Sequence, residues 1–229
     1  MNTLVPSEKR VSEGPHPHWR HVALTVMAVS AAVLASILWH NGGTRALDFF
    51  GHSISPAKRA YDFRLVNQQD VETRLSQWRG QVVLLCFGFT HCPNICPTTL
   101  TNLVDVLRAL PAAEREHFRM AFISVDPRRD TPEKLKNYLS YFDPRLVGLS
   151  GSKDEIDRAT GAFGASYAFI HNPGDAPENY NVMHSANVYL VNPKGDWELI
   201  YDFQQLQEPA KVAADIDNIL HSMSGGVGR

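Results

Sequence analysis

The sequence predicts an α/β domain in which buried strands alternate with amphipathic helices. Two apolar runs, residues 82–87 and 120–125, have the length of a strand, and Gly80 bounds the first of them. Between them, apolar residues recur at the i, i+3, i+4, i+7 spacing of a helix with one buried face: Leu100, Leu103, Val104, Leu107 and Leu110. A strand, a helix and a second strand in this order indicate a layered α/β fold.

The remaining predicted elements continue this order. They are a strand at 61–66, a turn at 73–80, a helix at 130–141, a strand at 147–149, a helix at 153–163, a strand at 166–170, a surface loop at 171–183, a hairpin from 185–191 to 197–203, and a last helix from Pro209. Asp130 or Thr131 is expected to cap the helix at 130–141, because Pro132 and Glu133 suit its first turn. Alternating strands and helices, then a hairpin and a closing helix, predict a thioredoxin-like fold.

The N-terminal part predicts a single transmembrane helix before this domain. Residues 22–39, VALTVMAVSAAVLASILW, carry no charge, and at 1.5 Å per residue they just cross a hydrocarbon core of ~30 Å. A cleaved signal peptide is the alternative. The twenty or so residues that precede the segment, and the lack of a clean A-x-A site after it, favour an anchor.

The charges beside this segment predict its orientation. Lys9, Arg10 and Arg20 precede it, and only Arg45 follows closely, so residues 1–21 are expected in the cytoplasm. Acidic residues in the first twenty argue against a mitochondrial transit peptide. The sequence therefore predicts a bacterial inner-membrane protein with its C-terminal domain in the periplasm.

The composition of the chain limits its possible functions and the number of its domains. The 229 residues are 44% hydrophobic and 20% charged, with a net charge of −2, which gives no reason to expect nucleic-acid binding. Residues 40–58, with several Gly and a Pro, predict a linker, and residues 59–229 suffice for one domain with its own core. Three cysteines are too few for a disulfide scaffold.

Two of the cysteines lie where the first buried strand leads into a helix. Cys92 and Cys96 are about one helical turn apart, so both thiols can face the same side. Because Pro97 suits a first helical position, we expect Cys92 in a turn and Cys96 at the N-cap, where the helix dipole favours thiolate. Such a pair can form a structural disulfide, cycle through a redox-active one, or bind a soft metal. Cys86, inside the apolar run, is expected to be a small buried hydrophobe.

Three motifs resemble the Sco (SenC/PrrC-like) family of membrane-tethered copper chaperones for cytochrome c oxidase assembly. They are FGFTHCPNICP at residues 87–97, SVDPRRDTPEKL at 124–135 and MHSANVYLVNPKG at 183–195. The resemblance implies a thioredoxin-like fold and copper bound by Cys92, Cys96 and His184. The implied partner is the copper-bearing subunit of cytochrome c oxidase or another copper protein.

This ligand set suits copper on chemical grounds as well. Thiolates suit Cu(I) and imidazole makes Cu(II) tolerable, whereas zinc would want a fourth ligand. His91 is expected outside the ligand set, and His171 is expected to face solvent. Asp126 and Asp130 are potential outer groups of a metal site, although a turn accounts for the first and a helix cap for the second.

The chain departs from the family pattern at two positions. Asn94, between the cysteines, and Met183, before the histidine, stand where the family often has aspartate. Both changes remove negative charge, but neither removes a primary ligand, so binding is expected to survive. The Met183 thioether is a soft potential ligand, although packing beside the site is the simpler expectation.

A second class of function remains open, a periplasmic thiol–disulfide oxidoreductase that reduces cysteines of a copper-receiving protein. A peroxiredoxin-like peroxidase is a third. His184 separates the first two, because disulfide exchange needs only the cysteines, whereas a Cu(II) site needs the imidazole.

Overall fold

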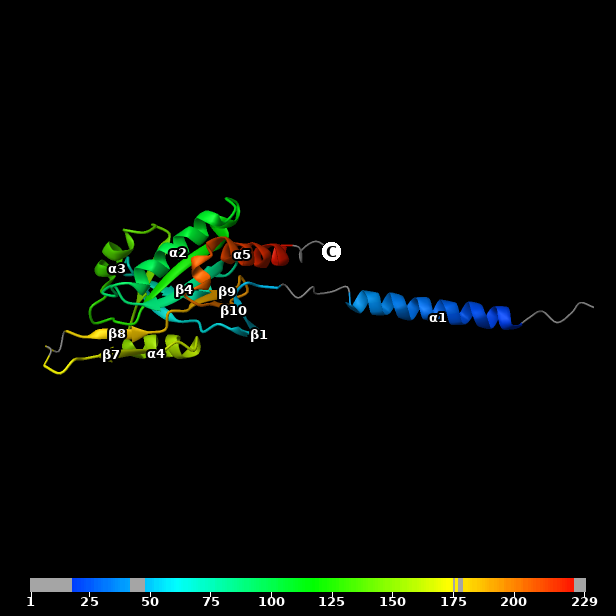
Figure 1. Ribbon diagram of the computed structural model, residues 1–229, viewed down its shortest axis with the longest axis horizontal. Helices are drawn as coiled ribbons and strands as arrows, with labels where there is room; N and C mark the ends of the chain where they lie inside the picture. The colour runs from blue at the N-terminus through cyan, green and yellow to red at the C-terminus, as the bar shows by residue number, and fades with distance from the viewer. Residues whose placement is uncertain (1–17, 42–47, 175, 177–178, 225–229) are drawn as a thin grey trace, which may run out of the picture. The chain divides into compact units, whose positions relative to one another are not determined.

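An eight-stranded sheet organises the larger of two units, Met1–Leu47 and Asp48–Arg229, into which the chain divides. The computed structural model describes residues 18–41, 48–174, 176 and 179–224 (Figure 1). The strands follow in the order β1 (His52–Arg59), β10 (Asp196–Tyr201), β9 (Val188–Val191), β4 (Val82–Gly88), β5 (Phe118–Ser124), β6 (Leu146–Ser150), β2 (Arg64–Asn67) and β3 (Glu72–Arg74).

The centre of the sheet is parallel and its edges are antiparallel. β4 pairs in parallel with β5, and β5 with β6, while β9 and β2 pair antiparallel with their neighbours. Every residue of β4 is buried, because strands flank it on both edges and side chains cover both of its faces. This burial confirms the strand predicted over residues 82–87.

Helices cover both faces of the sheet (Figure 1). On one side lie α2 (Ile95–Ala109), α3 (Pro132–Leu139) and α5 (Pro209–Ser224), of which α2 and α5 pack together. On the other lies α4 (Lys153–Ala162), followed by Phe163, whose ring contacts Phe87 of β4 and Tyr189 of β9. Short 3₁₀ turns complete the unit: η1 (Leu75–Trp78), η2 (Glu114–His117) and η3 (Gln205–Gln207).

The helix predicted over residues 130–141 is α3, and its cap is Thr131. The Thr131 side chain accepts a hydrogen bond from the Lys134 amide, and Pro132 is the first helical residue. Of the two capping residues that the sequence allowed, the structure therefore selects the threonine. Asp130 has a different role, described below.

A separate two-stranded sheet stands apart from the large one. It consists of β7 (Tyr167–Ile170) and β8 (Asn181–His184), with Tyr167 opposite His184. The predictions of a loop through residue 183 and a strand from residue 185 are therefore wrong, because residues 181–184 form β8 and the next strand begins at Val188. Only Val182 of β8 is buried, so no apolar pattern distinguished it from a polar loop.

Part of the predicted linker belongs to the folded unit. Residues 52–58 lie within β1, which pairs with β10 at the sheet edge. The buried carboxylate of Asp215 on α5 accepts hydrogen bonds from the backbone N–H groups of Phe50 and Gly51 and from the Tyr201 hydroxyl, at 2.9–3.0 Å. These bonds hold the start of the unit against its last helix, a contact that residue spacing does not reveal.

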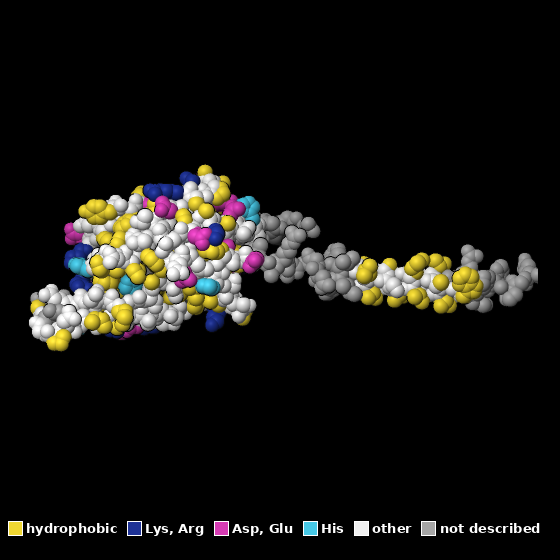
Figure 2. Space-filling model, in the orientation of Figure 1, with side chains coloured by type: hydrophobic (Ala, Val, Ile, Leu, Met, Phe, Trp, Pro, Cys, Tyr) yellow, Lys and Arg dark blue, Asp and Glu magenta, His cyan; other side chains and the backbone are white. Residues whose placement is uncertain are grey.

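The helix α1 (His18–Asn41) contains the predicted apolar segment. Its described side chains from residue 22 to residue 36 are exposed, and Figure 2 shows many apolar side chains on the face of α1 that is in view. In the part of the chain that the structure describes, no helix combines the length and the apolarity needed to cross a membrane. Residues 1–17 of the predicted tail and 42–47 of the predicted linker lie outside the described residues.

Gly88, the last residue of β4, is a position where a side chain does not fit. A Cβ atom there would lie 2.6 Å from Cε2 of Phe122 and 2.7 Å from Sγ of Cys96. We expect Gly88→Ala to lower the free energy of unfolding by about 1–3 kcal/mol, because a buried ring and a buried thiol must move. Urea unfolding of the full chain, followed by tryptophan fluorescence, measures this change.

Gly161→Ala in α4 is the matched control. A Cβ at Gly161 meets no atom within 4 Å, so alanine should leave stability unchanged or raise it by up to about 1 kcal/mol. Equal unfolding midpoints for the two variants would contradict the steric argument at Gly88.

Candidate metal centre

Cys92 lies in the turn between β4 and α2, and Cys96 lies in the first turn of α2, both at the carboxyl end of the central strand. The Cys92 amide donates to the Phe89 carbonyl at 3.2 Å, which closes the turn. α2 begins at Ile95, after Asn94, whose carbonyl accepts from the amide and hydroxyl of Thr98 at 3.3 and 2.9 Å. The cysteines therefore lie on either side of a helix start.

The prediction that Cys96 is the N-cap is wrong by two positions. Asn94 is the cap, Cys96 is the second helical residue and Pro97 the third. The first N–H groups of a helix have no intrahelical partner, so a proline fits the third position as well as the first. The shift places Cys96 on the buried face of α2.

Three potential ligand atoms converge beside this turn. One ligand atom from each of Cys92, Cys96 and His184 lies within 4.8 Å of the others. Sγ of Cys96 is 3.3 Å from Nε2 of His184, across 88 residues of sequence, and the Cys96 amide donates to Sγ of Cys92 at 3.4 Å. The structure thus brings together the three residues that the sequence analysis named.

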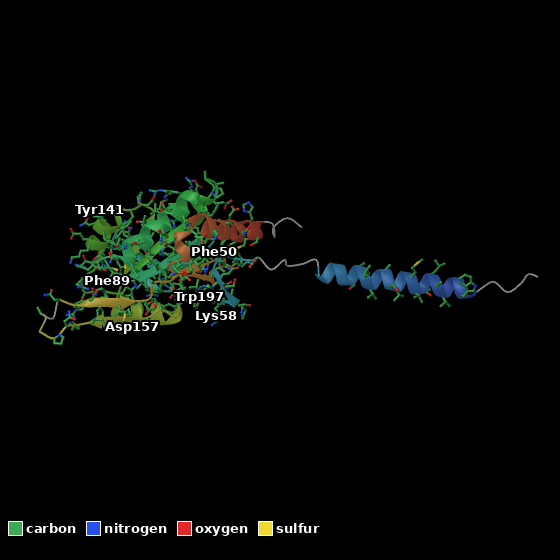
Figure 3. All side chains as sticks on the ribbon, viewed as in Figure 1. Phe50, Lys58, Phe89, Tyr141, Asp157 and Trp197 are labelled. Carbon is green, nitrogen blue, oxygen red and sulfur yellow. The ribbon has the colours of Figure 1, made fainter. Side chains whose placement is uncertain are left out.

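The His184 ring is oriented by its neighbours. Its Nδ1 lies 2.9 Å from the Ser185 carbonyl and donates to it, which leaves a lone pair on Nε2, the nitrogen that faces Cys96. The ring of Phe89 stands edge-on to the imidazole, with centroids 5.7 Å apart (Phe89 is labelled in Figure 3). A carbonyl partner on one nitrogen is the usual support of a histidine that binds metal through the other.

Burial determines the protonation state of the Cys96 thiol, which lies deeper in the protein than the Cys92 thiol. Desolvation raises the pKa of Cys96, a backbone hydrogen bond from Phe89 opposes the rise, and negative charge on Cys92 adds to it. The expectation that the helix start would favour thiolate is therefore wrong for Cys96, because desolvation raises its pKa by more than the backbone hydrogen bond lowers it. A bound metal must displace the proton, as it commonly does at thiol sites.

Cys86 has the buried role predicted for it. Burial raises the pKa of its thiol to about 12, and its Sγ contacts only the Ala121 carbonyl among hydrogen-bond partners in the described chain, at 3.8 Å. It is not part of the three-residue cluster.

A hollow of about 250 Å³ opens the site to solvent. Its lining is largely apolar and comes from the cysteine turn and β8: Phe89, Cys92, Pro93, Asn94, Ile95, Asn181, Val182, Met183 and His184. Cys92 and His184 are half-buried, whereas Cys96 lies beneath them. Met183 is 65% exposed at the edge of the hollow and is not packed under it.

The other two histidines near the site contribute no atom to the cluster. His91 is exposed, and its Nδ1 lies 3.2 Å from the Thr90 hydroxyl and 3.8 Å from Oδ1 of Asp130. His171 is exposed, and its ring lies beside that of Tyr180, with centroids 5.3 Å apart and a tilt of 45° between the planes. Both positions agree with their predicted places outside the ligand set.

Asp130 ties the cysteine turn to the end of β5. Its carboxylate is fully buried and accepts from the Thr90 amide at 2.9 Å, the Thr90 hydroxyl at 2.6 Å and the Ser124 hydroxyl at 2.6 Å. The sequence offered no signal for this role, because an aspartate before a helix is ordinarily explained as a cap. Asp130 therefore supports the turn without touching the ligand atoms.

Comparison with known proteins shows one family. A family model described as SCO1/SenC matches residues 52–221, which include the cysteine turn, Asp130 and His184. The chain belongs to the SCO1/SenC family. The predicted resemblance is confirmed, and so is the mixed α/β, thioredoxin-like fold, which Sco structures share.

Individual members of the family are similar to this chain over the folded unit. A "Putative copper-binding protein" of Stutzerimonas stutzeri is 39% identical over 142 residues, 61% of this chain and 68% of that protein. The copper-bound structure of Bradyrhizobium japonicum ScoI is 34% identical, with a TM-score of 0.63, over 70% of this chain and 98% of that one.

A more distant structure is that of BsSco, a member of the Sco family of cytochrome c oxidase assembly proteins in which a disulfide switch has been identified. It is 26% identical, with a TM-score of 0.55, over 72% of this chain and 95% of that one. The matches to curated relatives span between 44% and 69% of the relatives' own length.

The contacts of Asp130 predict a stability effect. Asp130→Ala leaves the buried Ser124 hydroxyl and two half-buried donors of Thr90 without their acceptor, so we expect the free energy of unfolding to fall by at least about 2 kcal/mol. Urea unfolding of the full chain measures it. Glu133→Ala removes the same charge from an exposed position nearby and should change stability by no more than about 0.5 kcal/mol. An equal loss in both variants would mean that charge, and not the buried acceptor, matters.

Proposed function

We propose that this chain is a copper metallochaperone, which binds Cu(I) and Cu(II) through Cys92, Cys96 and His184 and delivers the metal to another protein. The observation that carries the proposal is the convergence of two thiols and an imidazole nitrogen within 4.8 Å. Thiolates are soft ligands that hold Cu(I) in low coordination, and imidazole adds the nitrogen donor that Cu(II) prefers. Copper-binding relatives named above support the choice of metal.

The arrangement also suits a cargo that must leave. The cluster offers three ligand atoms from the described residues, and a structural zinc site would be closed by four. Cys92 and His184 border the open hollow, so ligands of a receiving protein can reach the metal from outside while Cys96 still holds it. Transfer can then proceed by exchange of one ligand at a time.

The proposed recipient is the copper-bearing subunit of cytochrome c oxidase or another copper protein. Support comes from BsSco, which is described as a member of a family of cytochrome c oxidase assembly proteins. The apolar lining of the hollow, which includes exposed Ile95 and Met183, offers surface that a docked protein would cover.

A thiol–disulfide oxidoreductase is the second candidate, and one observation favours it. Both thiols are free, and they lie within 4.8 Å of one another. Cys92 is only half-buried, so its sulfur is accessible enough to attack the disulfide of a partner protein. The same site can therefore prepare the thiols of a copper-receiving protein. Loss of His184 should leave this exchange near its wild-type rate.

For copper, we expect Cys92→Ser and Cys96→Ser to abolish stoichiometric binding. His184→Ala should weaken Cu(II) binding far more than Cu(I) binding, since two thiolates still hold Cu(I), and Cu(II) oxidises a dithiol that does not hold it firmly. Paramagnetic resonance and thiolate-to-Cu(II) absorption report on Cu(II), and competition with a Cu(I) chelator reports on Cu(I).

Cys86→Ser is the control for thiol loss, because that buried cysteine is outside the cluster and should affect stability without affecting copper stoichiometry. Stoichiometric copper in a Cys92/Cys96 double serine variant would refute the chaperone proposal. Unchanged Cu(II) spectra in His184→Ala would remove His184 from the ligand set.

We also propose that residues 22–39 anchor the protein in a bacterial inner membrane, with residues 1–21 in the cytoplasm, 40–47 outside as a connection, and the folded unit, which takes in the rest of the predicted linker and residues 59–229, as the periplasmic domain. The uncharged run and the exposed apolar side chains of α1 support this arrangement. Full-length protein should then stay with membranes during carbonate extraction, and protease should reach the domain only from the periplasmic side. A variant lacking residues 1–47 should be released, and recovery of a mature wild-type form that begins after Trp39 would indicate a signal peptide instead.

A further inference from the structure

Arg129 connects the two chain segments that carry the site. It lies in the turn between β5 and α3, and its side chain is 19% exposed. Its Nε pairs with the fully buried carboxylate of Asp126, and that carboxylate also accepts from the Tyr180 hydroxyl at 2.7 Å. The ion pair fixes the position of the guanidinium.

The same guanidinium reaches the strand that ends in His184. Its Nη1 donates to the Tyr180 carbonyl at 2.9 Å, and its plane lies over the Tyr180 ring, 3.8 Å from the centroid. Tyr180 immediately precedes β8, four residues before His184. Arg129 therefore holds both the backbone and the ring of the residue from which β8 starts.

On its other side, Arg129 faces the cysteine segment. The guanidinium carbon lies 5.8 Å from the centroid of Phe89, and Phe89 contacts both halves of the site. Its carbonyl closes the cysteine turn, and its ring stands edge-on to His184. The guanidinium thus lies near one aromatic ring from each segment, Phe89 beside the cysteine turn and Tyr180 before β8.

This bridge matters because β8 is not bonded to the large sheet. β7 and β8 form their own sheet, so no ladder of backbone hydrogen bonds sets the distance between β8 and β4. Only residues 185–187 separate His184 from β9, which pairs with β4, so the chain limits this distance and side-chain contacts determine where the end of β8 lies within that limit. In the described chain, Nη2 of Arg129 is buried without a hydrogen-bond partner, which costs folding free energy and argues that stability alone does not account for the residue.

We propose that Arg129 is a positioning residue for the metal centre, which holds His184 at the distance from the thiols that Cu(II) requires. The inference rests on the proposed copper site. Cu(I) needs only the two thiolates of one turn, so the contribution of Arg129 falls on the oxidised metal. It acts through Tyr180 and Phe89 and touches no ligand atom.

The test uses Arg129→Lys in the full-length protein. Lysine keeps a cation beside buried Asp126 but loses the planar contacts with the two rings and cannot reproduce the forked hydrogen bonding. We expect Cu(II) affinity to fall by about tenfold or more, with changed hyperfine coupling in the paramagnetic resonance spectrum, while Cu(I) affinity stays within about threefold. Arg128→Lys, at the exposed neighbouring position, is the matched control and should behave as wild type.

Tyr180→Leu is the second variant, because it removes the stacked ring and the hydroxyl bond to Asp126 while leaving Arg129 in place. It should reproduce the selective loss of Cu(II).

Equal Cu(II) affinity and spectra in Arg129→Lys, Tyr180→Leu and wild type would overturn the positioning role and leave the copper proposal intact. Equal losses of Cu(I) and Cu(II), together with a lower urea midpoint, would overturn it in favour of a purely structural role. Absence of copper binding in wild type would overturn both proposals.

Discussion

The contact between Gly88 and Cys96 is the constraint on which the metal centre depends. β4 ends in the one residue type without a side chain, and this lets the first turn of α2 rest directly on the strand, with Sγ of Cys96 filling the space where a Cβ would be. The Cys96 thiol is therefore buried, and its Sγ lies 3.3 Å from Nε2 of His184. Every other part of the site is placed relative to this sulfur.

Burial of that sulfur has an electrostatic consequence. In the metal-free protein, desolvation raises the pKa of Cys96 and so favours its neutral thiol in these apolar surroundings. A cation that binds there replaces the proton and pairs with the thiolate it creates. The absence of carboxylates at Asn94 and Met183 is consistent with a site whose charge arises on binding and not before.

Two buried aspartates stabilise the loops around the site without entering it. Asp130 binds the cysteine turn through Thr90, and Asp126 binds Arg129 and Tyr180 beside β8. Both come from the turn that follows β5, so one short segment holds both halves of the site. Buried carboxylates are tolerated because each of them receives several hydrogen bonds, which offset the cost of removing charge from water.

The sequence by itself determined the local features of this protein. The apolar run of β4, the amphipathic face of α2 and the one-turn spacing of Cys92 and Cys96 depend only on neighbouring residues, so their patterns predicted them. His184 was named by resemblance to a family, since nothing local marks it as a ligand. The order of strands and helices was sufficient for the fold class.

The tertiary structure decided what depends on residues far apart in the chain. Contact between His184 and Cys96 joins positions 88 residues apart, and the partners of Asp130, Asp126 and Asp215 come from other elements of the fold. Strands β1 and β8 carry few buried apolar side chains, so they form because a neighbouring strand supplies hydrogen bonds and not because of their own pattern. The protonation state of Cys96 also depends on the tertiary structure. Its pKa is raised by desolvation, which depends on the groups that the folded chain packs around the sulfur, and residue spacing does not predict that packing.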